Sequence, residues 1–157
     1  MSEEAVVSEI RSVLIPLDAS RLLLPNAVVA EVMNYQRPES RENAPDWFLG
    51  VMAWRGTSVP VVSFEGLIGG SVVEPGYRGR TIVTNTLNGN KTIPHIGLVS
   101  KAIPSLVRVN EENITPSDLK SDLGELIKES VNVNEGLALI PDLDELERRV
   151  LEIVSQE

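Results

Sequence analysis

Few residues in this 157-residue chain could do chemistry, and they are widely spaced. His95 is the only histidine, and it lies between Pro94 and Ile96 in a stretch that is typical of a strand. A lone histidine, without a second metal ligand or a nucleophile at a recognisable spacing, is more often a strand residue than a catalytic base. The sequence therefore gives His95 no chemical role.

The other candidate motifs also have simpler explanations. Asp142 and Asp144 stand two positions apart, but the chain around them lacks the glycine and the distal glutamate of a calcium loop. The glycine-rich stretch around Gly69-Gly70 lacks the Lys-Ser/Thr pair of a phosphate-binding loop. An enzyme needs a nucleophile, a base or a metal site at a recognisable spacing. The sequence predicts no catalytic residue, no cofactor and no metal site.

Composition limits the possible partners. The chain has 14 basic and 23 acidic residues and a formal net charge of −9, which argues against binding to nucleic acid or to an anionic membrane. It has no cysteine, as is common in a reducing compartment. Residues 2–10 contain three glutamates, unlike the start of a signal peptide, and no apolar run approaches the roughly 20 residues of a membrane span. We expect a cytoplasmic protein that does not insert into a membrane.

The stretch from Phe48 to Phe64 organises the rest of the chain. Two short apolar runs, 48–54 and 58–64, flank Arg55-Gly56 and predict two buried strands that reverse at the glycine. Pro60 cannot donate a backbone hydrogen bond, which predicts an edge position or a bulge. Arg55 is the only strong charge in this stretch, so it needs a partner or solvent.

The apolar pattern predicts about nine or ten short strands in the whole chain. They form two groups, separated by a glycine-rich connector at 65–79. Asn88-Gly89 predicts a type I′ hairpin between strands at 80–87 and 91–99. Thr115 and Pro116 predict the start of a helix, and Asp142 predicts the cap of a closing helix. These patterns by themselves indicate a mainly β protein with two lobes.

Four segments in a fixed order carry a family resemblance. Residues 50–56 with 59–62 resemble the G-V-x-N-L-R-G-x-x-x-P-V-V-D-L signature of CheW-like domains, and residues 29–32 resemble the family's V-x-E-V segment. Residues 96–99 resemble its V-G-L-L-V-D strand, and residues 138–146 resemble its closing L-L-D-x-x-x-L. The match covers about residues 9–148, nearly the whole chain.

The resemblance implies a fold of two five-stranded SH3-like β-barrels that share a core. We expect a single domain over 9–148, with a first barrel at about 9–64, a connector at 65–79 and a second barrel at about 80–141. Short helices are expected as well, including a C-terminal helix over 142–157.

The resemblance also implies a non-catalytic adaptor that couples a chemoreceptor to a CheA-type histidine kinase. In such proteins one barrel packs against the regulatory domain of the kinase, and the cytoplasmic tip of the receptor lies in the apolar groove between the barrels. The partner-binding residues that match the family motif are Val29, Glu31, Val32, Arg55 and Gly56. For Glu31 and Arg55 the structural alternative is an ion pair that ties one lobe together.

The chain departs from the family pattern at several positions. Ser63 replaces the aspartate that usually follows Pro-Val-Val, and Trp54 replaces the leucine before Arg-Gly. Ala53 and Ser100-Lys101 are further departures. They suggest a divergent member, such as those of gene clusters that control type IV pili and twitching. Two alternatives stay open: a stand-alone β-barrel module that binds another protein or a small ligand, and an enzyme whose active site needs a partner chain.

Overall fold

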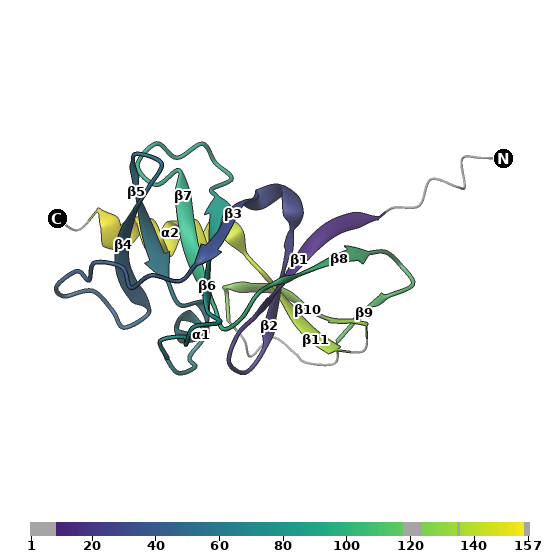
Figure 1. Ribbon diagram of the computed structural model, residues 1–157. Helices are drawn as coiled ribbons and strands as arrows, with labels where there is room; N and C mark the ends of the chain where they lie inside the picture. Colours follow the sequence, from purple (N-terminus) through teal and green to yellow (C-terminus); the bar gives the residue numbers. More distant parts are fainter. Residues whose placement is uncertain (1–8, 118–123, 135, 156–157) are drawn as a thin grey trace.

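A computed structural model describes residues 9–117, 124–134 and 136–155 of the chain (Figure 1). The strands are β1 (Ile10–Pro16), β2 (Arg21–Pro25), β3 (Val29–Asn34), β4 (Phe48–Trp54), β5 (Thr57–Val62), β6 (Arg80–Asn85), β7 (His95–Ser100), β8 (Ser105–Val109), β9 (Ile114–Pro116), β10 (Ile127–Val133) and β11 (Gly136–Pro141). The helices are the short 3-10 helix η2 (Asn26–Val28), α1 (Phe64–Leu67) and the C-terminal α2 (Leu143–Val154).

The strands form two sheets that lie side by side, with α2 along the smaller one (Figure 1). The six-stranded sheet has the order β8-β1-β2-β11-β10-β9, and the five-stranded sheet has the order β3-β6-β7-β5-β4. Neighbouring strands are antiparallel except for the parallel pairs β2–β11 and β5–β7. The prediction of a mainly β fold with two subdomains and a C-terminal helix is confirmed, although one sheet has six strands where five were expected.

The two subdomains are not consecutive in the sequence, which corrects the expected barrels at 9–64 and 80–141. β1 pairs with β8 over five residues, and β2 pairs with β11, so the first two strands belong with the C-terminal strands. β3 to β7 form the other sheet, on both sides of the expected connector. Apolar patterns mark where strands occur but carry no information about which distant strand completes a sheet.

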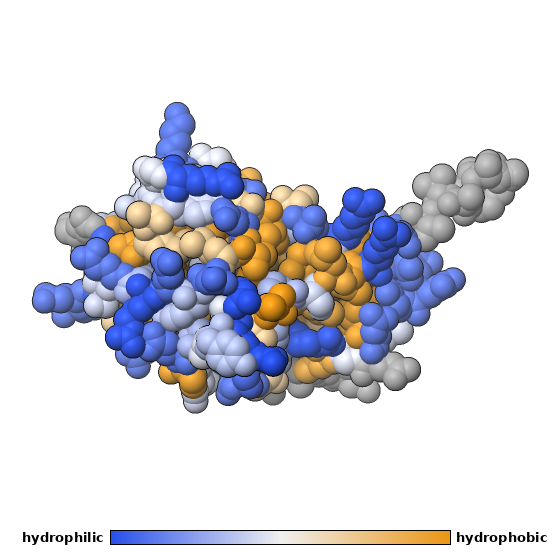
Figure 2. Space-filling model, viewed as in Figure 1, coloured by the Kyte–Doolittle hydropathy of each residue, from blue (hydrophilic) through white to orange (hydrophobic). Residues whose placement is uncertain are grey.

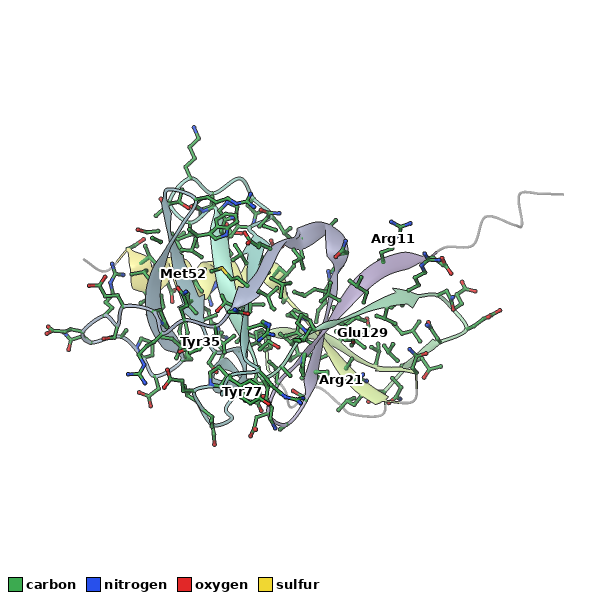
Figure 3. The ribbon with its side chains drawn as sticks, in the orientation of Figure 1. Arg11, Arg21, Tyr35, Met52, Tyr77 and Glu129 are labelled. Carbon is green, nitrogen blue, oxygen red and sulfur yellow. The ribbon has the colours of Figure 1, made fainter. Side chains whose placement is uncertain are left out.

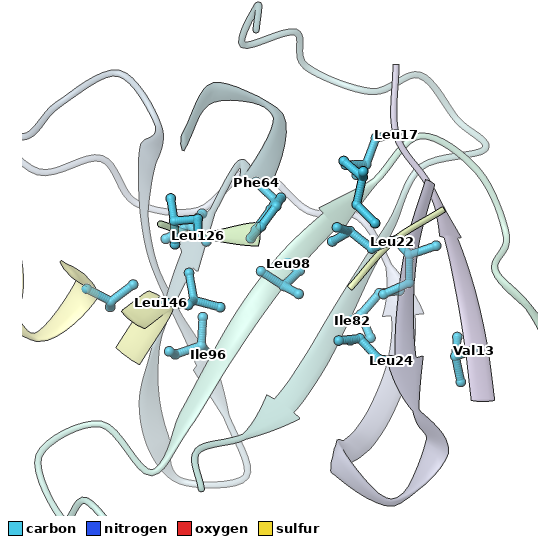
Figure 4. Packing of buried hydrophobic residues seen from close by; sticks show 14 of the residues in the cluster. Val13, Leu17, Leu22, Leu24, Phe64, Ile82, Ile96, Leu98, Leu126 and Leu146 are labelled. Carbon is cyan, nitrogen blue, oxygen red and sulfur yellow. The ribbon is translucent and has the colours of Figure 1, made fainter. Parts of the chain in front are cut away.

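Three apolar clusters explain this arrangement. One cluster joins the two sheets and α2, and each sheet has a smaller cluster of its own. Because strand side chains alternate between faces, Val13 and Ile15 face the shared cluster while Leu14 faces the cluster of the six-stranded sheet. Figure 4 shows the shared cluster, to which Leu22 comes from one sheet and Ile82 from the other. The expected shared core is therefore present.

Helix α2 closes the shared cluster. Asp142 is its N-cap, as predicted, and its Oδ1 accepts a hydrogen bond from the Glu145 backbone N–H at 3.0 Å. The helix buries Leu146 and Val150 against the shared cluster and ends at Val154. Its described extent is shorter than the predicted 142–157.

The predicted antiparallel pairing of the strands on either side of Asn88-Gly89 is confirmed, because β6 pairs with β7. The predicted tight turn is wrong, because the pairing extends only as far as Asn85 and His95 and a longer loop joins the two strands. The Asn88 side chain instead reaches α2, where its Nδ2 donates to Asp144 Oδ1 at 2.9 Å and to Glu147 Oε1 at 3.1 Å. These bonds hold the loop against the helix and compete with a tight turn.

The predicted helix start at Thr115-Pro116 is also wrong, because both residues belong to β9, which pairs with β10. The middle of that predicted helix, residues 118–123, lies outside the described residues.

Candidate partner-binding site

The β4–β5 hairpin positions Arg55 at the tip of the five-stranded sheet. Trp54 pairs with Thr57 across the turn, and the two central residues have positive φ angles, 50° at Arg55 and 79° at Gly56. Two consecutive residues with positive φ are the requirement of a type I′ turn, so this geometry occurs here and not at Asn88-Gly89. The predicted reversal at Gly56 is confirmed. The edge position predicted for Pro60 is wrong, because β5 lies between β7 and β4. The pairing of β5 with β7 begins only at the next residue, Val61, so Pro60 is not required to donate to β7.

A β-bulge in β3 sorts the other predicted residues between the two faces of the sheet. The register with β6 shifts between Val29 and Glu31, so that Val29 lies opposite Thr84 while Val32 lies opposite Ile82. Opposite residues share a face, and Ile82 belongs to the shared cluster. Val29 and Val32 therefore stand on the face toward the shared cluster, although they are three positions apart. Glu31 stands on the other face, opposite Val83.

Glu31 is the centre of a polar cluster that joins β3 to the hairpin. Its Oε1 accepts a hydrogen bond from Trp54 Nε1 at 2.8 Å and lies 3.3 Å from Arg55 Nη2. The Arg55 guanidinium lies over the Trp54 ring, 4.8 Å from its centroid, in a cation–π contact. His95 packs against the same ring edge to face at a centroid distance of 4.7 Å. The predicted ion pair is thus present, with the indole as a third member.

Exposure determines what this cluster contributes to stability. The Arg55 side chain is 69% exposed and the Glu31 side chain is 38% exposed, whereas Trp54 is buried at 9%. An ion pair this exposed contributes less than about 1 kcal/mol to folding because water screens the charges. The indole is part of the packed interior, whereas the Arg55 charge is largely and the Glu31 charge partly accessible to a partner.

Apolar side chains are exposed at the edges of the two sheets, and the one on β3 stands on the opposite face from this cluster. Val32 is 42% exposed on the edge strand β3, and Leu106 is 80% exposed on the edge strand β8. Leu106 lies opposite Val13, so it also stands on the face that forms the shared cluster. Figure 2 shows apolar residues gathered over β1 and β8. Each of these side chains stands on the shared-cluster face of its own sheet and is exposed to solvent.

The structure thus separates the five predicted residues into two sets: Val29 with Val32, and Glu31 with Arg55 and Gly56. Sequence reasoning missed Trp54, which appeared only as a departure from the family pattern, and it missed Leu106. The signal for Trp54 was its position next to the only charge in an apolar stretch. No local signal marks Leu106, because its importance depends on the pairing of β8 with β1.

Two of the departures have local structural roles. Ser63 is the N-cap of α1, and its Oγ accepts a hydrogen bond from the Gly66 backbone N–H at 3.1 Å. Lys101 makes an ion pair with Asp18 at 3.4 Å, next to Ser100, whose Oγ donates to the Pro16 carbonyl at 3.3 Å. These contacts attach the end of β7 to the β1–β2 turn.

The described residues contain no group of three or more His, Cys, Asp or Glu side chains that could hold a metal ion. Within the same residues, no helix is long and apolar enough to cross a membrane.

Comparison with known proteins identifies the family. A family model described as "CheW-like domain" matches residues 11–150. The chain belongs to the CheW-like domain family. It is 28% identical over 109 residues to "Chemotaxis protein CheW" of Rhizobium meliloti (strain 1021), a match that covers 69% of this chain and 67% of the relative.

A solved structure has the same fold. It is described as the scaffolding protein TtCheW from Thermoanaerobacter tengcongensis, and it matches with a TM-score of 0.72 at 18% identity, over 85% of this chain and 84% of that one. Membership of the CheW-like family supports a role as a chemotaxis adaptor. The assignment to a pilus or twitching system stays a prediction.

Proposed function

We propose that this protein is a non-catalytic, cytoplasmic adaptor that couples a chemoreceptor to a CheA-type histidine kinase. The observation that carries the proposal is the exposed apolar side chain of Val32 on the edge strand β3, with the solvent-accessible Glu31–Arg55 pair on the other face of the same sheet. In a member of the CheW-like family, an apolar edge flanked by charges supports a helix-in-groove contact.

The receptor tip is proposed to lie along the apolar edges of the two sheets. Val29 and Val32 supply apolar contact from β3, and Arg55 with Glu31 supplies charged groups at the hairpin. Gly56 lies in open space, with nothing within 4 Å of an added Cβ, so a partner can approach the backbone closely there. The kinase regulatory domain is proposed to pack edge to edge against one subdomain. Neither contact needs a cofactor.

Calorimetric titrations of the purified protein test the proposal. One titrant is the isolated regulatory domain of a CheA-type kinase, and the other is a soluble fragment of the cytoplasmic hairpin of a chemoreceptor from the same organism. We expect saturable binding to both. Arg55→Ala should weaken binding to the receptor fragment and leave the melting temperature nearly unchanged, because the ion pair is exposed.

The matched control is Arg78→Ala, which removes an exposed arginine from the loop before β6. It should bind like the wild type. Failure of the folded wild type to bind either titrant would contradict the adaptor role.

A further inference from the structure

Two arginines face each other directly across β1 and β8. The antiparallel register places Arg11 opposite Arg108, and both side chains are exposed. Arg11 lies at the end of β1 that is farthest from the five-stranded sheet (Figure 3). Among the residues that the structure describes, no carboxylate makes an ion pair with either arginine.

This pair has no evident benefit for folding. Like charges directly opposite each other on neighbouring strands destabilise a sheet. The nearby acidic residues Glu9, Glu111 and Glu112 precede β1 or follow β8, and none of them forms an ion pair with the arginines. The chain as a whole carries a net charge of −9, so an uncompensated cationic spot is contrary to its overall charge. An acidic partner would turn the repulsion into attraction.

The arginines continue the apolar surface described above. The next opposite pair on the same face is Val13 with Leu106, of which Val13 is in the shared cluster while Leu106 is 80% exposed. A shallow depression of about 370 Å³ at this place is lined by Arg11, Ser12, Asn26, Leu106, Val107 and Arg108. In Figure 2 the apolar area over β1 and β8 is bordered by hydrophilic residues. An exposed leucine beside two arginines fits an amphipathic, acidic ligand.

We propose that Arg11 and Arg108 bind carboxylates of the helical partner segment whose apolar side chains cover Leu106. This inference rests on the proposed function, because the receptor tip is taken as that segment. Two positions along a strand span about 6.7 Å. A helix rises 1.5 Å per residue, so a helix that runs along the strands covers this span in about four residues. The segment should therefore carry Asp or Glu about four positions from the apolar residue that contacts Leu106.

The test is a calorimetric titration of the whole protein with the receptor hairpin fragment. The variants are Arg11→Ala, Arg108→Ala and the two combined. The control combines Arg78→Ala with Lys91→Ala, which removes the same charge from exposed positions in two other loops. We expect each single variant to weaken binding about threefold and the double variant about tenfold, while the control stays within twofold of the wild type.

Two further readouts separate binding from folding. The melting temperature of the double variant should stay the same or rise, because the like-charge repulsion is removed. Raising the salt concentration should weaken the wild type more than the double variant. Replacing each Asp and Glu of the fragment singly by its amide should identify at least one position whose effect disappears in the double variant.

The outcomes distinguish this inference from the proposed function. No binding by the folded wild type would overturn both. Wild-type binding that the double variant retains within twofold would overturn only the role of the arginines. Binding of the wild type to phosphatidylglycerol vesicles that is lost in the double variant would assign the pair to a membrane surface, which also overturns it.

Discussion

Two glutamates accept side-chain hydrogen bonds from connections between strands of the five-stranded sheet or from a residue at the end of such a strand, and they differ in burial. Glu31 accepts hydrogen bonds from the Trp54 and Arg55 side chains of the β4–β5 hairpin, and its own side chain is 38% exposed. Glu147 on α2 accepts hydrogen bonds from the Asn88 and Asn90 side chains of the β6–β7 loop, and it is only 6% exposed. Because it is buried, the Glu147 network, called the clamp below, stabilises the contact between the β6–β7 loop and α2. The Glu31 network is more exposed, so a partner can reach its charges.

The largest effect on stability is expected at Glu147, the more buried of the two glutamates. Glu147→Ala removes a buried carboxylate that accepts bonds from two amides, and hydrogen bonds to charged groups contribute about 1.5–3 kcal/mol. We expect a loss of about 2 kcal/mol in the free energy of unfolding, measured by urea denaturation. Glu152→Ala on the exposed side of the same helix is the control and should change little. Equal losses in both variants would contradict the clamp.

An intermediate effect is expected at Trp54, which packs in the apolar cluster of the five-stranded sheet and also donates a hydrogen bond to Glu31. Trp54→Phe keeps an aromatic ring in the apolar cluster but removes the Nε1–H that donates to Glu31. We expect about 1 kcal/mol of destabilisation, together with weaker receptor binding because Arg55 and Glu31 lose their common support. Wild-type binding by this variant would show that the indole does not position the charges.

A small effect on stability with a clear effect on binding is expected at Glu31. Glu31→Gln removes the charge and keeps the shape, so the free energy of unfolding should fall by less than about 1 kcal/mol. Affinity for the receptor fragment should fall several-fold in calorimetry. A loss of stability as large as that of Glu147→Ala would mean that both networks are structural.

The smallest effect is expected at a third glutamate and depends on pH. Hydrogen bonds from Arg148 and then Arg149 lower the pKa of Glu145 from 4.5 to about 2. Since the folded-state pKa is lowered, Glu145 stabilises the protein above about pH 4.5, and this contribution is lost as the pH falls toward 2. The difference in melting temperature between wild type and Glu145→Gln should therefore shrink between pH 6 and pH 3. A difference that stays constant would contradict the lowered pKa.

Local sequence predicted most of the strands, the turn at Arg55-Gly56, the cap at Asp142 and the ion pair of Glu31. It could not predict contacts between distant segments. The local sequence at Asn88 favours a tight turn, whereas the bonds of its side chain to α2 join residues more than 50 positions apart and leave no local pattern. The division of the strands between subdomains failed for the same reason, since β1 with β8 and β2 with β11 pair over long separations. The family motif includes Val29, Val32 and Glu31, but it does not reveal the bulge in β3. That bulge places the two valines on one face of the sheet and Glu31 on the other.

Co-sedimentation shows whether this protein couples a receptor to a kinase. Membranes that carry the chemoreceptor would be mixed with the CheA-type kinase, with and without this protein, and the kinase in the pellet would be measured. We predict that the wild type brings the kinase into the pellet and that Arg55→Ala, although folded, does so much less. An amount of sedimented kinase that is the same with and without the protein would contradict the adaptor role.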